Sequence, residues 1–212
     1  PLRPASEYGR DKAAADHVLL EAYHREGFPV SIIKPSTTFG VRWFMLRQIA
    51  WEGGWVDRVR KGKPIVVCGD GRALHQWLHP DDAALAFVHM LGRSRCIGQT
   101  YNMTRREFAS WADYHRTAMK VIGRDVELVG VPLANLLAAK IPGVGICESI
   151  FSHNTIYNPD RLMRDVPEFR PRVPLEHMLG AVLEAMDREK RVPDSDLETW
   201  EDRLIAAQRA VR

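Results

Sequence analysis

Cysteine is scarce in this chain, and long hydrophobic runs are absent. The three cysteines lie far apart and form no C-x-x-C pair, which excludes a zinc knuckle and fits a reducing, cytoplasmic compartment. No apolar run approaches the roughly 20 residues that a membrane-spanning helix needs, and no signal peptide is visible. We therefore expect a cytoplasmic location, no metal site and no membrane segment.

Strong charge of one sign and a glycine-rich phosphate loop are missing as well. The net charge is +3, and 45% hydrophobic with 27% charged residues is typical of a globular protein. Neither G-x-G-x-x-G nor G-x-x-G-x-x-G occurs, and the glycine pairs at Gly53-Gly54 and Gly143-Val144-Gly145 lack the strand–turn–helix setting of a phosphate site.

The densest basic cluster is short. It contains Arg58, Arg60, Lys61 and Lys63, which we interpret as the end of a helix, where cations suit the helix dipole. A nucleic-acid surface needs a longer basic stripe with interleaved aromatic residues. Nucleic acid is therefore not an expected partner.

The most informative pattern that is present is Tyr8-Gly9-Arg10-Asp11-Lys12, at the start of a predicted helix. Its spacing places the phenol of Tyr8 and the ammonium of Lys12 one turn apart on one helical face. A cation held there stabilises phenolate, which allows a tyrosine to act as a general acid/base. The same spacing also occurs in a solvated helix start, where a lysine extends past a tyrosine.

A helix–strand unit follows. Ala13 to Arg25 combines strong helix formers with apolar residues at helical spacing, and Gly27 ends the helix as a C′ residue. Pro29 to Ile33 has the composition of a short buried strand. Lys34-Pro35-Ser36-Thr37-Thr38-Phe39-Gly40 leaves that strand at its C-terminal end, where ligands bind in open α/β sheets.

Three motifs thus occur in one order. They are Tyr8 to Lys12, Lys34 to Gly40, and Gly69-Asp70-Gly71…His75-Gln76-Trp77-Leu78-His79-Pro80-Asp81-Asp82-Ala83-Ala84. Together they resemble the patterns YxxxK, RPxxxYG and GDGxxxRDFIHVDDxA of the extended short-chain dehydrogenases/reductases, the NAD-dependent epimerase/dehydratase family. The resemblance is to the C-terminal two thirds of such a protein. It is clear over about residues 1 to 105, and beyond them only the general layout of the chain is similar.

The resemblance implies roles for particular residues. Tyr8 is the expected catalytic acid/base, and Lys12 is expected to assist it and to hydrogen-bond the nicotinamide ribose. The backbone of Pro35, Ser36 and Thr37 is expected beside the nicotinamide of NAD or NADP. The implied substrate-binding residues are Thr38, Phe39, Arg72, His75 and Trp77.

Two departures from the family pattern concern the substrate. The family usually has Arg-Asp where this chain has His75-Gln76, and that arginine commonly helps to hold the diphosphate of a nucleotide-sugar. Histidine does not replace bidentate phosphate recognition, although Arg72 is a candidate for the role. Lys34 replaces an arginine and keeps the charge. The sequence therefore supports the cofactor chemistry better than a sugar-nucleotide substrate.

Other parts of the family's site lie upstream of the tyrosine. They are a catalytic Ser or Thr, for which Ser6 is too close, the glycine-rich pyrophosphate loop, and the residue that selects NAD or NADP. Because the chain starts at Pro1, we expect a fragment that lacks the leading cofactor-binding segment. Such a fragment should bind a dinucleotide poorly, and micromolar NAD(H) binding by the isolated chain would contradict this expectation.

Further elements follow from periodicity and turn residues. Asp81 or Asp82 is expected as a helix N-cap and His79 as a structural hydrogen-bonding residue. The tryptophans in 43–60 are interpreted as packing residues rather than as the lining of a cleft.

We predict helices over 83–91, 110–122, 133–141, 175–189 and 197–211, a mostly helical stretch over 43–60, and strands over 64–67, 75–79, 100–103 and 126–131. The apolar helix over 133–141 should be buried or cover the cleft.

The predicted fold is α/β. Residues 1–42 would be the C-terminal part of a Rossmann-like, doubly wound NAD(P)-binding domain, to which residues 75–105 partly return. Residues 43–212 would mainly form a smaller α/β substrate-binding lobe.

The first functional hypothesis is an NAD(P)-dependent epimerase, dehydratase or reductase acting on a small-molecule hydroxyl or carbonyl compound, with a sugar nucleotide among the candidates. The alternative is a non-catalytic relative that binds RNA or a protein partner. A homodimer through the Tyr8–Arg25 helix is expected, since this helix usually packs the dimer in the family.

Overall fold

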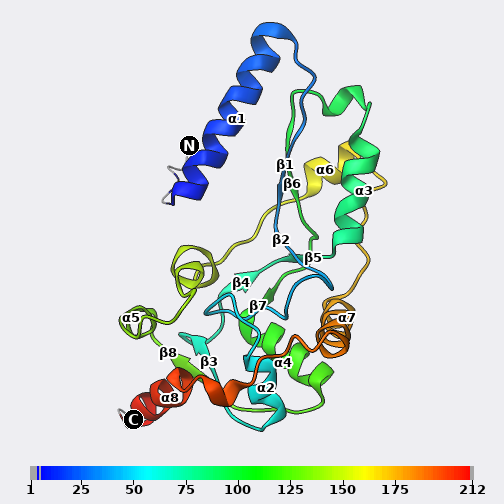
Figure 1. Cartoon of the computed structure of the whole chain (residues 1–212). Coiled ribbons are helices and arrows are strands. Elements are labelled where there is room, and N and C mark those ends of the chain that lie inside the picture. Colours follow the sequence, from blue (N-terminus) through cyan, green and yellow to red (C-terminus); the bar gives the residue numbers. More distant parts are fainter. Residues whose placement is uncertain (1–3, 5, 211–212) are drawn as a thin grey trace. The chain divides into compact units, whose positions relative to one another are not determined.

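The computed structural model describes residue 4 and residues 6–210, and the chain divides into two compact units (Figure 1). The first unit comprises Pro1–Thr38, Trp77–Arg106 and Tyr157–Arg172. The second unit comprises Phe39–Gln76, Glu107–Ile156 and Val173–Arg212. From the sequence, the first break was expected after residue 42 and the return at 75–105, with Tyr157–Arg172 in the second part and not in the first.

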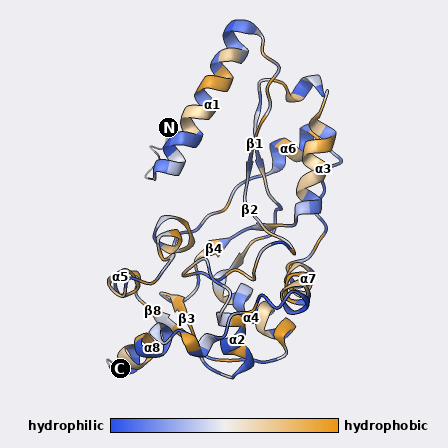
Figure 2. Ribbon diagram, in the orientation of Figure 1, coloured by the Kyte–Doolittle hydropathy of each residue, from blue (hydrophilic) through white to orange (hydrophobic). Residues whose placement is uncertain are grey.

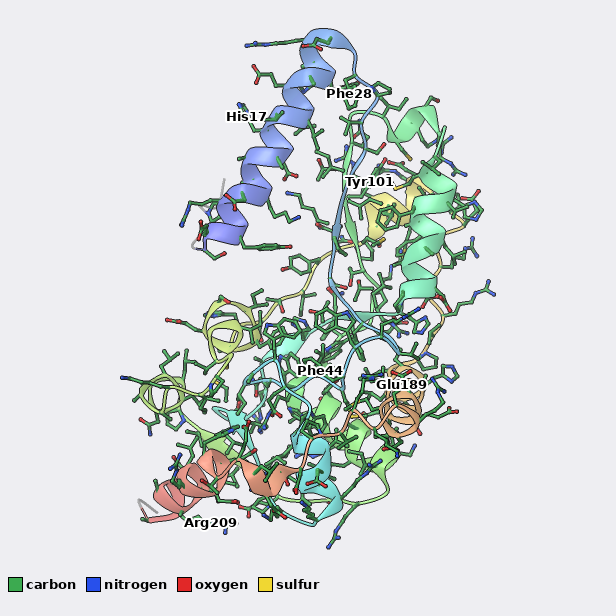
Figure 3. The ribbon with its side chains drawn as sticks, in the orientation of Figure 1. His17, Phe28, Phe44, Tyr101, Glu189 and Arg209 are labelled. Atoms are coloured by element: carbon green, nitrogen blue, oxygen red, sulfur yellow. The ribbon has the colours of Figure 1, made fainter. Side chains whose placement is uncertain are left out.

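The first unit is built on parallel strand pairs. β1 pairs with β6, with Ile32 opposite Thr100, and β2 pairs with β5. Figure 3 labels Tyr101 on β6, and its hydroxyl donates to the Asp165 carboxylate of α6 at 3.0 Å. The elements are α1 (Glu7–Glu26), β1 (Ile32–Pro35), β2 (Thr37–Thr38), β5 (Trp77–Leu78), α3 (Pro80–Met90), η1 (Ser94–Cys96), β6 (Thr100–Met103) and α6 (Asp160–Asp165). Parallel pairing with interleaved helices confirms the α/β class.

Helix α1 begins and ends where its sequence predicts. The Ser6 side chain accepts a hydrogen bond from the Gly9 N–H at 3.1 Å, which caps the first turn. Gly27 ends the helix with φ +70°, a left-handed conformation that glycine adopts without a Cβ clash. None of the twenty residues of α1 is buried. In Figure 2, hydrophobic and hydrophilic residues alternate along this helix.

Helix α3 corrects the expected cap. The N-cap is His79, whose Nδ1 accepts the Asp81 N–H at 3.2 Å, and Pro80 occupies the first helical turn. The Asp82 carboxylate instead accepts the Arg172 N–H at 3.0 Å, which connects the helix to the end of the third segment of this unit. The structural role predicted for His79 is confirmed.

The second unit holds a parallel pair, an antiparallel pair and most of the helices. β3 runs parallel to β8 with Ile65 opposite Leu128, and β4 runs antiparallel to β7. The elements are α2 (Trp55–Arg60), β3 (Ile65–Cys68), β4 (Leu74–His75), β7 (Ala109–Ser110), α4 (Trp111–Ile122), β8 (Leu128–Val131), α5 (Leu133–Ala138), η2 (Cys147–Phe151), α7 (Leu175–Arg188), η3 (Ser195–Leu197) and α8 (Trp200–Ala210).

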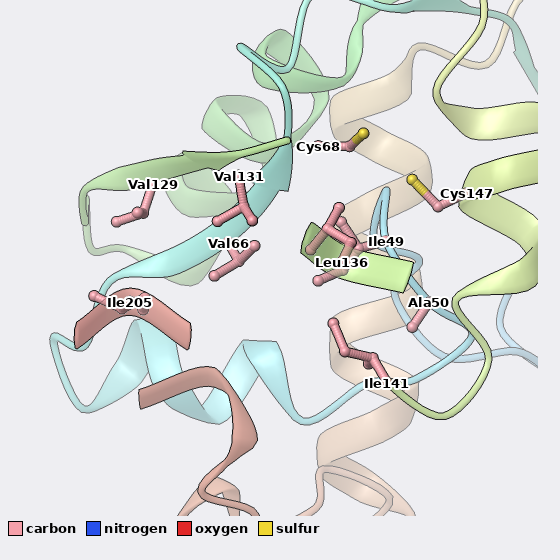
Figure 4. Close-up of a cluster of buried hydrophobic side chains, with 10 residues drawn as sticks. All are labelled: Ile49, Ala50, Val66, Cys68, Val129, Val131, Leu136, Ile141, Cys147 and Ile205. Carbon is pink, nitrogen blue, oxygen red and sulfur yellow. The ribbon is translucent and has the colours of Figure 1, made fainter. Parts of the chain in front are cut away.

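A buried hydrophobic cluster holds the β3–β8 pair to its surroundings (Figure 4). Ile205 brings α8 into it, and Trp200 and Leu204 of the same helix pack against it. Helix α8 therefore packs on the β3–β8 pair through its apolar residues. The cluster consists of Ile49, Ala50, Val66, Cys68, Val129, Val131, Leu136, Ile141, Cys147 and Ile205.

Helix α4 forms as its sequence indicates. Ser110 and Asp113 make a reciprocal capping box, in which the Ser110 hydroxyl oxygen accepts the Asp113 N–H at 3.1 Å. Gly123 ends the helix with φ +85°. Six of its twelve residues are buried, which fixes α4 in the core of the second unit.

Four sequence-based predictions about local structure were wrong. Residues 43–54 are irregular and helix begins only at Trp55, because apolar and polar residues of 45–50 are buried together and leave no solvent face. The strand over 75–79 is two short strands, β4 and β5, with different partners. Helix α5 ends at Ala138 and buries only Leu136. The last helix begins at Trp200, and Leu197 is exposed in the preceding turn.

Among the described residues, no helix is both long enough and apolar enough to cross a membrane.

Candidate functional site

Tyr8 and Lys12 share one face of the first turns of α1. The Lys12 Nζ lies 5.3 Å from the centroid of the Tyr8 ring, a cation–π contact. Tyr8 is 71% exposed, and Lys12 is exposed as well. The helix therefore presents a phenol and an adjacent ammonium at the surface, where both can meet a ligand.

Helix α1 contacts the rest of its own unit through Asp16 and Tyr23. The Lys34 ammonium of β1 forms an ion pair with the Asp16 carboxylate, about midway along the helix. Nearer its end, the Tyr23 ring lies against Gly98, where an added Cβ would come within 2.3 Å of ring atoms. Gly98 also has φ +73°, so this close contact depends on glycine. In Figure 3, the exposed His17 projects outward from α1.

The C-terminal end of β1 carries three of the residues implied as cofactor-binding, Pro35, Ser36 and Thr37. The Ser36 N–H donates to the Met103 carbonyl of β6 at 3.0 Å, while the Ser36 hydroxyl is buried and has no partner among the described residues. The Thr38 hydroxyl donates to the Ser36 carbonyl at 3.0 Å. Pro35 is exposed, and Thr37 pairs with Trp77 across β2 and β5. Pro35, Ser36, Thr37, Thr38 and Trp77 thus form one strand end in the first unit.

Three implied substrate residues lie in the second unit. Phe39 is fully buried, with its ring 6.3 Å from that of Tyr114. Arg72 is 84% exposed along its side chain, and its Nε lies 3.5 Å from the Asp70 carboxylate. His75 is buried, its Nδ1 hydrogen-bonds the Thr155 hydroxyl, and burial lowers the pKa of His75 to about 4. His75 is therefore neutral near pH 7.

Around His75 lies a set of aromatic rings, the aromatic cluster, formed by His75, Trp111, Phe151, Trp51 and Trp43. The His75 ring centroid lies 5.2 Å from that of Trp111 and 5.1 Å from that of Phe151. Phe151 continues the contacts to Trp51 at 5.6 Å, and Trp51 to Trp43 at 5.6 Å. Trp43 and Trp51 are 48% and 41% exposed, so the cluster reaches from the core to the surface. Core packing accounts for the position of Trp111. The packing role predicted for the tryptophans of 43–60 accounts less well for Trp43 and Trp51, because both are partly exposed at the surface.

The basic cluster at the end of α2 is neutralised by carboxylates. Arg58 is buried and donates to Asp202 at 2.7 Å, and Arg60 donates to Asp187 at 2.7 Å. Lys61 contacts Asp57, Asp194 and Asp196, and Lys63 contacts Asp196 at 2.6 Å. A phosphate backbone would have to displace these partners, so the cluster offers no support for nucleic-acid binding.

Sequence reasoning missed a buried ion pair in the second unit. Arg47 is 1% exposed, and its Nη2 donates to Glu201 at 2.7 Å and to the Val66 carbonyl at 3.1 Å. Burial alone would lower the pKa of Arg47, but Glu201 and Glu52 raise it overall. The only signal in the sequence is an arginine within the apolar run from Phe44 to Ala50. The pair fixes α8 beside β3 and is structural rather than part of the candidate site.

No group of three or more His, Cys, Asp or Glu side chains within residues 6–210 is placed to hold a metal ion.

The chain is similar to several known proteins. A profile of the NAD dependent epimerase/dehydratase family matches residues 1–104. The 2'-dehydrokanamycin reductase of Streptomyces kanamyceticus is 25% identical over 209 residues, which are 99% of this chain and 59% of the reductase. A dTDP-glucose 4,6-dehydratase of Xanthomonas campestris is 32% identical over 103 residues, 49% of this chain and 28% of that enzyme.

Among solved structures, that of RMD from Pseudomonas aeruginosa complexed with NADPH is similar with a TM-score of 0.69 and 16% identity. The similarity covers 89% of this chain and 59% of that one, and it supports a Rossmann-like fold. The chain thus spans less than two thirds of the length of these proteins. Residues 1–104 of this chain thus resemble the NAD dependent epimerase/dehydratase family.

Proposed function

We propose that the protein is an NAD(P)-dependent oxidoreductase of the epimerase/dehydratase family, in which Tyr8 is the acid/base and Lys12 assists it. The observation that carries the proposal is the Tyr8–Lys12 pair, with the ammonium 5.3 Å from the ring centroid, in the same unit as the strand end at Ser36. The family match over residues 1–104 and the two related enzymes support this reading.

The residues at the end of β1 fit a nicotinamide cofactor. Ser36 offers a buried hydroxyl without a partner among the described residues, and such a group is expected to find a ligand. Pro35 and Thr37 flank it, and Lys12 supplies an exposed ammonium for a ribose hydroxyl. When bound, the nicotinamide supplies the position that accepts or donates a hydride. We propose NAD or NADP as this cofactor.

The residues of α1 would handle the proton. The Tyr8 hydroxyl donates its proton to a substrate carbonyl oxygen on reduction, or its phenolate accepts the proton of a substrate hydroxyl on oxidation. Lys12 stabilises the phenolate between these steps because a positive charge beside the ring favours the anion. The exposed position of Tyr8 leaves the phenol free for a substrate.

The substrate we propose is a small hydroxyl or carbonyl compound without a diphosphate. His75 stands where the family usually has a diphosphate-binding arginine, and it is buried and neutral, with its Nδ1 already bonded to Thr155. It cannot form the bidentate contact that an arginine makes. The similarity to 2'-dehydrokanamycin reductase, a protein named for a substrate without a nucleotide, also favours a substrate that has no diphosphate.

We also propose that α1 forms the interface of a homodimer. Its twenty residues bury no side chain in the single chain, although Val18, Leu19 and Tyr23 are among them. A second copy of the helix would cover these apolar groups. Free Cys68, Cys96 and Cys147 support a reducing, cytoplasmic location.

Replacing Tyr8 tests the proposed function. Tyr8→Phe in the full-length protein should lower turnover by roughly two to four orders of magnitude, the usual contribution of a general acid/base. Reduced-nicotinamide absorbance would be followed with a panel of carbonyl compounds that includes 2'-dehydrokanamycin. Tyr157→Phe, at another exposed tyrosine of the same unit, is the matched control. Near-normal turnover in Tyr8→Phe would rule out the proposed role.

A further inference from the structure

Two of the three cysteines of this chain meet inside the second unit. Cys68 ends strand β3, and Cys147 begins η2, a short π-helix, almost eighty positions later in the sequence. Figure 4 shows their sulfur atoms pointing toward each other across one buried hydrophobic cluster. Both residues are buried and free, and the third cysteine, Cys96, belongs to the hydrophobic core of the other unit.

The two thiols differ in acidity because they share a hydrogen bond. The hydrogen bond from Cys147 lowers the pKa of Cys68, although burial opposes this. The same hydrogen bond, together with burial, raises the pKa of Cys147. Of the two thiols, Cys68 therefore loses its proton more readily and is the better candidate nucleophile, whereas Cys147 keeps its proton more strongly.

The backbone around the two sulfurs is already held together. The Gln48 side chain accepts the Cys68 N–H through Oε1 at 2.9 Å and donates from Nε2 to the Phe151 carbonyl at 3.2 Å. One side chain thus connects the end of β3 to the end of η2. A covalent link between the cysteines would join segments that Gln48 already keeps adjacent.

We propose that Cys68 and Cys147 form an oxidative modification site, in which a peroxide converts the facing thiols into an internal disulfide. The Cys68 thiolate attacks one oxygen of hydrogen peroxide, gives a sulfenic acid and releases hydroxide, which takes up a proton to become water. The Cys147 sulfur then attacks the sulfur of the sulfenic acid, and the hydroxyl leaves with the Cys147 proton as a second water. Two thiols are oxidised by two electrons and one peroxide is reduced.

The disulfide would act on the aromatic cluster. η2 carries Phe151, whose ring contacts Trp51 at 5.6 Å and His75 at 5.1 Å. Linking η2 to β3 fixes Phe151 and constrains the unfolded chain over a long loop. We expect the oxidised protein to unfold at a temperature higher by about 5 to 10 °C, an increase that a dithiol reductant reverses.

Peptide mapping of the full-length protein tests the proposal without any substitution. The protein is treated with hydrogen peroxide, its remaining thiols are alkylated under denaturing conditions, and its unreduced digest is analysed by mass spectrometry. The expected result is a Cys68–Cys147 cross-linked peptide, with alkylated Cys96 as the internal control. Three alkylated cysteines, sulfinic or sulfonic acids in place of the cross-link, or a cross-link that includes Cys96 would overturn the proposal.

Variants give an independent check. Cys147→Ser should abolish the reductant-sensitive increase in unfolding temperature, and Cys96→Ser should retain it. A persistent increase in Cys147→Ser would overturn the assignment. Because these sites are remote from Tyr8 in sequence and need no cofactor, the result does not depend on the proposed enzymatic function.

Discussion

Helices α1 and α4 begin and end by the same local rules and differ in what they bury. Each has a serine N-cap, at Ser6 and Ser110, and each ends at a left-handed glycine. Yet α1 buries none of its twenty residues, whereas α4 buries six of twelve. Caps and spacing therefore define where a helix lies in the sequence, while its packing partners decide how much stability it contributes.

The largest effect should come from the buried face of α4. Trp111 is fully buried, and its ring centroid lies 4.5 Å from that of Phe151 and 5.2 Å from that of Tyr114. Trp111→Ala should lower the free energy of unfolding by about 3 to 5 kcal/mol, since it removes a large core side chain. Trp43→Ala at the surface is the matched control and should cost less than about 1 kcal/mol. Denaturant titration followed by circular dichroism measures both, and equal losses would contradict the burial pattern.

Acid should weaken the second unit through two buried histidines. Burial lowers the pKa of His75 to about 4, and burial together with Arg47 lowers that of His115 on α4 to about 3. Below the ordinary histidine pKa, the unfolded chain takes up protons that the folded chain excludes. Each histidine should therefore cost about 1.4 kcal/mol of stability per pH unit as the pH falls from about 6.5 toward its folded pKa.

The measurement is the free energy of unfolding at several pH values between 7 and 4.5, by urea titration. His115→Gln should reduce the pH dependence, because it removes one of the two titrating groups. His17→Gln on α1, where the ring is exposed, is the control and should leave the dependence unchanged. A dependence that stays the same in His115→Gln would contradict the assignment.

The two serine caps should contribute differently to the stability of the whole chain. Ser110→Ala removes a reciprocal capping box from a packed helix and should cost about 1 kcal/mol. Ser6→Ala removes a cap from a helix without buried residues and should mainly fray its first turn. Global unfolding by denaturant and local protection by hydrogen exchange separate the two outcomes. A larger global loss in Ser6→Ala would reverse the comparison.

The smallest effect on the stability of the single chain is expected at Val18, on the exposed side of α1. It is 63% exposed, so Val18→Arg should change the free energy of unfolding of a single chain by about 0.5 kcal/mol or less. If α1 forms the proposed dimer, the same change should shift the protein toward monomer in analytical ultracentrifugation. Val88→Arg, at an equally exposed valine of α3, is the control. An unchanged sedimentation profile in Val18→Arg would exclude α1 as the interface.

Local signals predicted the helices well and the irregular segments poorly. The helix predicted over 110–122 formed between Ser110 and Gly123, and Gly27 ended α1 as predicted, because capping involves groups only a few residues apart. Residues 43–54 were expected to be mostly helical, yet the segment is irregular, and the Arg47 and Gln48 side chains bond to groups outside it. Their partners Glu201 and Phe151 lie more than a hundred residues away in the sequence, and no local pattern identifies them.

The sequence by itself determined the resemblance to the epimerase/dehydratase family, the α/β class and the Tyr8–Lys12 pair, because each depends on residue types at short, fixed spacings. Only the tertiary structure decided that His75 is buried and neutral, that Tyr157–Arg172 joins the first unit, and that Cys68 faces Cys147. These properties depend on burial and on contacts between distant segments. Solvent exclusion and long-range proximity arise from the packing of the whole unit, and they set protonation and reactivity where spacing alone cannot.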